Sequence, residues 1–272
     1  MSASESLAEL FSLSLIRKRI DSAIETLGGV GILAAQVARR ALARPLGARG
    51  IVQQIEAIGV RSTSVVVLTA IFSAMVITIQ FSVKLSRFGA KEWAGNAVGV
   101  TLARELGPVM TALMVGGRVG AGIAAELGSM AVTEQIDAVR ALGADPVKKL
   151  VVPRVLATLV VLPLMGSMAV VLGVFAGGMV AALEPDVHMS YFVNAALRST
   201  TLNDYFSGLG KTVFFALNIS LVACYLGMNT RGGTVGVGRA TTQTVVITSV
   251  ITLVSDFFLT KLFLAIGWGG AI

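Results

Sequence analysis

Residues 155–183 read VLATLVVLPLMGSMAVVLGVFAGGMVAAL, an apolar run without a single charged side chain. A helix needs about 20 residues to cross the hydrocarbon core of a bilayer, so this run is long enough to span it with a tilt or a kink. Pro163 and Gly166 give a physical reason for a kink near its start. The run predicts a membrane-spanning helix.

The rest of the chain has the same character. The sequence is 55% hydrophobic and 14% charged, with a mean hydropathy of +0.83, whereas soluble domains are about half apolar and a quarter charged. We therefore predict an all-α integral membrane protein with five transmembrane helices in one domain, residues 64–272. The four further spans are expected at 64–83, 97–117, 207–228 and 244–266.

Basic residues predict the orientation of these spans. Segments 1–63, 118–154 and 228–243 hold 15 Lys and Arg, against 4 in 84–96, 184–206 and the C-terminal tail. Short loops rich in Lys and Arg stay cytoplasmic, so the N-terminus is expected inside and the C-terminus outside. The net charge of +7 is explained by these flanks rather than by a nucleic-acid partner, because no basic groove with interleaved aromatic residues is evident.

The N-terminal region, residues 1–63, is predicted to be cytoplasmic and to lack a cleaved signal, because it has no continuous apolar segment. Residues 23–44 combine an apolar face with arginines and predict an amphipathic helix in the membrane interface. Residues 51–62 predict a second amphipathic helix leading into the first span. Ordinary cytoplasmic helices are the alternative.

The cytoplasmic loop 118–154 has acidic residues at helix-compatible spacing opposite an apolar side, which predicts a short amphipathic helix ended by Gly143. Such a helix packs either on its own bundle or on a partner. The acidic residues are Glu126, Glu134 and Asp137, and the apolar ones are Ile136, Val139 and Leu142.

Ionisable residues inside spans are the main sign of a site, since each costs about 2.5–3.5 kcal/mol at a helix centre. Arg104 and Glu105 lie in the second span, Lys211 in the fourth and Asp256 in the fifth. These residues either contact a lipid headgroup or hold the bundle together, and the sequence leaves both roles open. Lys261 is close enough to a helix end to snorkel to the interface.

Other chemistry finds little support. Cys224 is the only cysteine and His188 the only histidine, so no metal site is expected. The glycine-rich stretch 232–238 lacks the Lys-Ser/Thr that reaches nucleotide phosphates. We expect no covalent catalysis and no cofactor in this chain, and any ATP would be bound by a partner.

Several blocks of the sequence resemble the MlaE/YrbE permeases of MCE-type lipid transport systems. The blocks occur in order and at compatible spacing. They are RELGPVMTALMVGGRVGAGIAAELGSMAVTEQIDAVRALGADPVKKLVVPR (104–154), RGGTVGVGRATTQTVV (231–246) and SDFFLTKLF (255–263).

The resemblance implies an ABC transporter permease of the bacterial inner membrane that moves lipid, usually phospholipid, to or from the cell envelope. It implies a second permease copy or related subunit, two cytoplasmic ATPase subunits and a periplasmic ring of MCE-domain proteins. By the same analogy the loop 118–154 contains the coupling helix, with Glu126, Glu134 and Asp137 as candidates for ATPase contact.

Two other functions are weighed against this one. An ion- or proton-coupled carrier would use Glu105, Lys211 and Asp256 as its relay, and a scramblase-like protein would need no ATP. The absence of an evident internal repeat counts against the architecture of many secondary carriers.

Overall fold

A computed structural model of the chain describes residues 21, 24–42, 47–183 and 188–267. The regular structure of these residues is entirely helical. Five helices are long and apolar enough to cross a membrane, as predicted for an all-α integral membrane protein. They are Ala48–Ser86, Lys91–Val132, Val147–Ala181, Leu202–Met228 and Gly233–Ala265.

The chain divides into two compact units, Met1–Leu46 and Gly47–Ile272. In the first unit the described part is a helix over 24–41, within the segment for which an interfacial helix was predicted. Its place at a membrane surface stays a prediction. Residues 1–20, 22–23 and 43–46 lie outside the described part of the chain.

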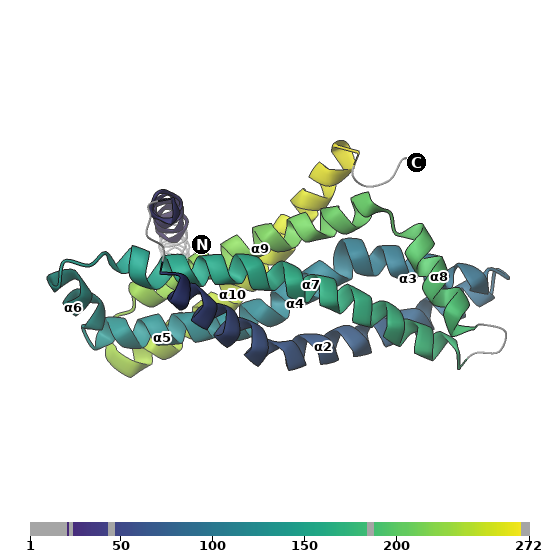
Figure 1. Cartoon of the computed structure of the whole chain (residues 1–272), viewed down its shortest axis with the longest axis horizontal. Helices are drawn as coiled ribbons and strands as arrows, with labels where there is room; N and C mark the ends of the chain where they lie inside the picture. Colours follow the sequence, from purple (N-terminus) through teal and green to yellow (C-terminus); the bar gives the residue numbers. More distant parts are fainter. Residues whose placement is uncertain (1–20, 22–23, 43–46, 184–187, 268–272) are drawn as a thin grey trace, which may run out of the picture. The chain divides into compact units, whose positions relative to one another are not determined.

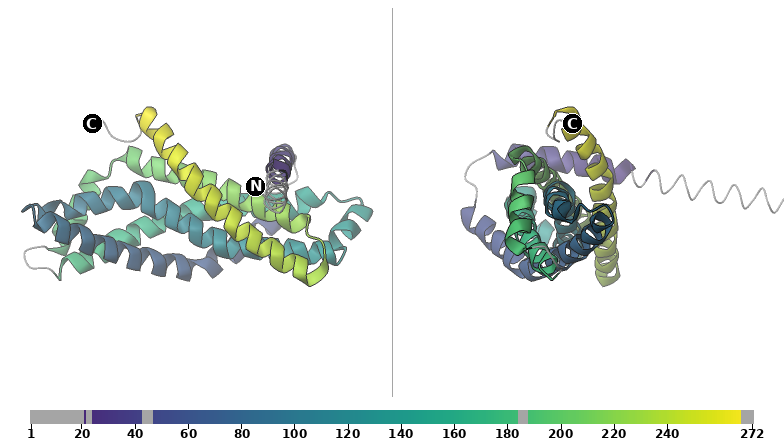
Figure 2. Two further views of the ribbon diagram at one scale, coloured as in Figure 1. Left: turned by 180° about the vertical axis from the view of Figure 1, so that it is seen from behind. Right: turned by 90° about the vertical axis from the view of Figure 1, so that its right-hand side faces the viewer.

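The second unit is a bundle in which helices distant in sequence lie side by side (Figures 1 and 2). Helix α2 (Ala48–Ser86) packs chiefly against α7 (Val152–Ala181). Helix α9 (Leu202–Met228) packs against α7, α5 (Ala121–Val132) and α10 (Gly233–Ala265). The apolar windows of α2 and α10 are only 17% and 11% buried, so these two helices present their sides to the surroundings of the bundle.

The second span is longer than predicted. It runs from the turn η1 (Lys91–Trp93) through α3 (Ala94–Thr101), η2 (Leu102–Leu106), α4 (Gly107–Val115) and η3 (Gly116–Gly120) into α5. The loop predicted to begin at residue 118 therefore begins only after Val132. Residues 121–132 stay helical because they are rich in Ala and contain no proline. Both η2 and η3 are π-helical turns, which are frequent at functional sites.

Two further expectations need correction. Residues 51–62 form part of α2 rather than a separate helix, because no proline or turn residue interrupts them before the span. The predicted external loop 184–206 contains a helix, α8 (Met189–Ser199). Its Phe192 is buried at 1% exposure, and Gly99 of α3 allows close packing, since a Cβ there would lie 2.8 Å from Cα of Ala196.

Helix α7 continues without interruption past Pro163. Helix α6 (Gln135–Ala141) lies at one end of the bundle and α8 at the other (Figure 1). Between α6 and α7 the chain forms the π-turn η4 (Val147–Val151). The two ends of the bundle thus correspond to the predicted cytoplasmic and periplasmic loops, which fall on opposite sides as the five-span topology requires.

Candidate functional site

A cluster of charged side chains lies inside the bundle where η2, α9 and α10 meet. The ammonium of Lys211 lies 2.6 Å from Oε2 of Glu105 and 2.9 Å from Oδ1 of Asp256. The Lys211 side chain is 2% exposed, so its charge depends on these two carboxylates rather than on water. Three of the four residues that the sequence marked as costly inside spans are therefore neighbours in the structure.

Thr260 is a fourth member of this cluster that the sequence analysis missed. Its Oγ1 accepts a hydrogen bond from Nζ of Lys211 at 2.7 Å and lies 3.3 Å from Oε1 of Glu105. It also lies 2.8 Å from the carbonyl oxygen of Asp256. Thr260 follows Asp256 by one helical turn, so a search for polar residues one turn from each intramembrane charge would have found it.

Arg104 forms a second ion pair with a residue that was not predicted. Its Nη2 lies 2.5 Å and its Nε 2.6 Å from Oδ1 of Asp204, which is almost fully buried. Asp204 also caps α9 in a capping box with Thr201, accepting from the backbone N–H of Thr201 at 2.9 Å. The sequence analysis missed Asp204 because it precedes the predicted start of the fourth span at 207, although the Thr-x-x-Asp spacing was a visible signal.

Close packing of α9 on η2 makes both ion pairs possible. Gly208 faces the second span so directly that a Cβ would overlap the carbonyl oxygen of Ala103 and lie 3.1 Å from Pro108. Any larger residue would separate α9 from the turn that carries Arg104 and Glu105. Arg104 and Glu105, which are neighbours in sequence, can thus reach Asp204 and Lys211, which both lie on α9.

A small pocket of about 70 Å³ adjoins the cluster. The side chains of Arg104 and Glu105 are 24% and 37% exposed, so one positive and one negative group remain accessible beside it. The wall of the pocket is partly apolar. The lining residues are Arg104, Glu105, Ser207, Lys211, Thr260, Phe263 and Leu264.

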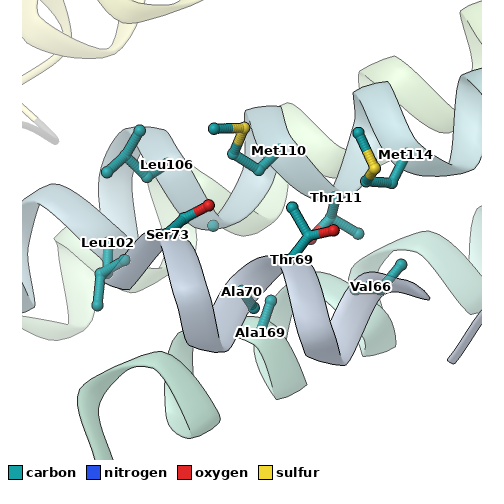
Figure 3. A pocket seen from close by; sticks show the side chains of 11 residues that line it. Val66, Thr69, Ala70, Ser73, Leu102, Leu106, Met110, Thr111, Met114 and Ala169 are labelled. Atoms are coloured by element: carbon teal, nitrogen blue, oxygen red, sulfur yellow. The ribbon is translucent and has the colours of Figure 1, made fainter. Parts of the chain in front are cut away.

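The other side of η2 is apolar and closely packed. Leu102 and Leu106 border a cleft between α2 and α4, into which Met110 and Met114 also project (Figure 3). The cleft offers only about 10 Å³, the space of about one water molecule. The turn η2 therefore lies between a narrow, mainly apolar cleft and the charged pocket.

The acidic residues of the cytoplasmic loop do not share one helix. Glu126 lies on α5, where its carboxylate is 2.9 Å from Nη2 of Arg154. Glu134 occupies the turn before α6 with φ of 59°, and only Asp137 lies within α6 itself. The prediction of one acidic helix face was therefore wrong for Glu126, because α5 continues the second span without a break, and Glu134 lies at the N-cap of α6 rather than on its face.

Helix α6 is a short helix that leaves side chains unburied. It ends before Gly143, whose φ of 75° suits glycine, as predicted. Ile136 is buried at 4% exposure, whereas Leu142 is 85% exposed. Asp137 pairs with Arg140 at 2.7 Å, and both side chains are exposed. The loop helix packs through the buried Ile136 and the half-buried Val139, and it leaves an apolar and acidic surface open.

Nothing in the described part of the chain adds a metal centre. No group of three or more His, Cys, Asp and Glu side chains within it is arranged to hold an ion. Cys224 is buried on α9.

Five helices long enough to span a membrane and a charge cluster inside their bundle define a polytopic membrane protein. The chain matches the sequence model of the family described as permease MlaE over residues 51–262 and belongs to that family. A probable ABC transporter permease of Rickettsia conorii is 37% identical over 91% of this chain and 96% of its own length. A probable ABC transporter permease of Synechocystis is 36% identical over 92% of this chain and 93% of its own length.

A plant protein is also similar. TRIGALACTOSYLDIACYLGLYCEROL 1 of Arabidopsis thaliana, a chloroplastic protein, is 36% identical over 86% of this chain and 67% of its own length. Together the family and these relatives identify the chain as an ABC transporter permease, a transport subunit rather than an enzyme.

Proposed function

We propose that this permease moves lipid, with phospholipid as the substrate class, between the bacterial inner membrane and the periplasm or outer envelope. ATP hydrolysis is supplied by a separate cytoplasmic ATPase. A second permease copy and a periplasmic ring of MCE-domain proteins complete the transporter.

The charged pocket is the observation that carries this proposal. It presents a guanidinium and a carboxylate beside the apolar side chains of Phe263 and Leu264. A phospholipid headgroup carries a phosphate that pairs with Arg104 and, in zwitterionic lipids, an ammonium that pairs with Glu105. A small inorganic ion would leave the apolar part of the wall without a partner. The pocket thus suits an amphiphilic substrate.

The charge balance supports a headgroup of mixed sign. Arg104 and Lys211 face three carboxylates, those of Glu105, Asp204 and Asp256. With all five groups ionised, one negative charge is left over, which favours a cationic group of the headgroup beside Glu105 while the phosphate pairs with Arg104. The Arabidopsis relative is named after a glycolipid, which is consistent with a lipid substrate.

Helix α6 supplies the surface for coupling to the ATPase. Leu142, Glu134 and Asp137 are exposed at the same end of the bundle and would contact a groove of the ATPase. The open apolar sides of α2 and α10 are the surfaces available to lipid and to the second copy.

The experiment is purification of the tagged permease from its native membrane, followed by mass spectrometry of the bound lipids and proteins. We expect phospholipid, an ABC ATPase and an MCE-domain protein to copurify. In the fraction of the double variant Arg104→Gln with Glu105→Gln that still carries both proteins, the lipid should be lost. Lipid retention that is equal in variant and wild type would contradict a headgroup site at this pocket.

The orientation is tested by thiol labelling. Asn203 is exposed in the first turn of α9 and Cys224 is buried, so Asn203→Cys in a Cys224→Ser background leaves one accessible thiol. An impermeant reagent should label it from the periplasmic face of inner-membrane vesicles. Labelling from the cytoplasmic face would overturn the proposed topology.

A further inference from the structure

A second groove lies between the N-terminal half of α2 and the start of α5, and the charge cluster does not contribute to it. It measures about 270 Å³. Pockets for small molecules are about 300–1,000 Å³, so this groove is of the size of a headgroup rather than of a whole lipid.

Two arginines from different helices line the groove. Arg61 comes from α2 and Arg118 from η3, and both are exposed. Among the residues that the structure describes, neither guanidinium forms an ion pair with a carboxylate. Glu126 also lines the groove, but its carboxylate is paired with the buried Arg154. The groove therefore carries an excess of two positive charges.

Both arginines lie at the expected level of lipid headgroups. Arg61 precedes the predicted first span by three residues, and Arg118 follows the predicted end of the second span directly. The helices themselves continue past these points, α2 back to Ala48 and the second span on to Val132. Arginines at this depth meet the phosphates of one leaflet.

The floor of the groove is apolar. Ile58, Val119 and Ile123 line it and are 4–6% exposed. A free anion would interact only with the two guanidinium groups. A lipid would also place its glycerol and upper acyl carbons against these side chains, which favours a lipid as the occupant.

We infer that this groove binds the phosphate of an anionic glycerophospholipid at the membrane surface. The two guanidinium groups donate to the phosphate oxygens from two sides, an arrangement for which arginine is better suited than lysine. The inference does not depend on which lipid the transporter carries, because a lipid bound here need not be the cargo.

The test places a thiol in the groove. Gly122 lines it and has open space where a Cβ would stand, so Gly122→Cys in the Cys224→Ser background reports occupancy. Gly238→Cys, also in open space, is the control. The full-length permease in detergent micelles is labelled with a thiol reagent in the presence of phosphatidylglycerol, phosphatidylcholine or inorganic phosphate. Labelling rates are compared.

We expect phosphatidylglycerol to slow labelling at position 122 and not at position 238. The double change Arg61→Gln with Arg118→Gln should weaken this protection by about tenfold or more in lipid concentration, because two charge-assisted hydrogen bonds are lost. General attraction of anionic lipid depends on the number of basic residues near the membrane surface. The matched control Arg231→Gln with Arg239→Gln therefore removes equal charge from exposed positions of the same end and should keep the protection.

Three results would overturn the inference. The first is protection that survives the loss of Arg61 and Arg118. The second is equal loss of protection in the Arg231 and Arg239 control, which would indicate nonspecific attraction. The third is protection by inorganic phosphate without protection by phosphatidylglycerol, which would indicate a site for free anions.

Discussion

The charge cluster inside the bundle and the charged hairpin of α5 and α6 use the same residue types in opposite ways. In the cluster, Lys211 is 2% exposed and contacts side chains from two other spans. In the hairpin, Asp137 and Arg140 are 67% and 59% exposed, and each pairs only with its neighbour three residues away. Burial makes the first set depend on its internal partners, whereas water screens the second.

This difference separates what the chain does alone from what it does with a partner. The intramembrane charges have their partners within the bundle and hold three spans together while leaving Arg104 and Glu105 partly open. The exposed charges of α6 contribute little to the fold, and a contact with the ATPase is the role proposed for them. Mutations should therefore affect stability at the cluster and partner binding at the hairpin.

The largest effect is expected at Lys211. Replacing it by methionine leaves the carboxylates of Glu105 and Asp256 facing each other without a cation, and breaking a buried pair costs about 3–5 kcal/mol. The melting temperature of the detergent-solubilised permease should fall sharply. Lys261→Met is the control, because that ammonium lies over the ring of Phe257 outside the cluster and its loss should have little effect.

A triple variant then separates cohesion of the bundle from lipid contact. Lys211→Met with Glu105→Gln and Asp256→Asn removes every charge of the Lys211 group, so stability should largely return. If the group also contacts headgroups, lipid transport should stay lost. Restored transport would assign these charges to packing alone.

The next largest effect is expected at helix α6, for which the coupling role is proposed. Glu134→Lys with Asp137→Lys reverses the acidic surface of the hairpin, and losing one side of a charged pair at an interface costs about 2–5 kcal/mol or more. ATPase copurification or ATP-driven transport should be abolished. Permease abundance and melting temperature should stay unchanged, because both carboxylates are exposed. Normal ATPase binding together with normal transport would show that this helix is not the coupling element.

A smaller effect is expected from the contact between α9 and η2. Gly208→Ala places a methyl group against the carbonyl of Ala103, and overpacking of this kind costs about 1–3 kcal/mol. The melting temperature should fall, and the ion pair between Arg104 and Asp204 should be weakened. Gly238→Ala, in open space, is the control. An unchanged melting temperature in Gly208→Ala would show that α9 can shift without disturbing the cluster.

The lengths of the apolar segments predicted the five spans well. A helix must have about 20 apolar residues to cross a bilayer, and few helices outside membranes have so many. It did not predict where the helices end. Nothing in the hydropathy distinguishes a helix that stops at the membrane surface from one that continues, as α2 and α5 do, so residues 51–62 and 118–132 were assigned to separate elements. Helix α8 was missed because its amphipathic pattern is short and lies inside a polar loop.

The cluster was predictable in part. The cost of a charge inside a span identified Arg104, Glu105, Lys211 and Asp256 without any knowledge of their distances. Their pairing could not be derived, since it depends on how η2, α9 and α10 pack. Asp204 was missed because it is a capping residue at a span end and so carried no penalty in the sequence.

The smallest effect tests the hairpin side of the comparison. Arg140→Gln removes the partner of Asp137, and an exposed pair at this spacing contributes about 0.2–0.5 kcal/mol. The melting temperature should therefore be unchanged within error, in contrast to Lys211→Met. If Asp137 contacts the ATPase, release from Arg140 frees the carboxylate for that contact, and ATPase binding should be kept or slightly strengthened. A large fall in the melting temperature would show instead that the pair of Asp137 and Arg140 stabilises the fold. Stability would then not depend on the bundle alone, and the hairpin would not serve partner binding alone.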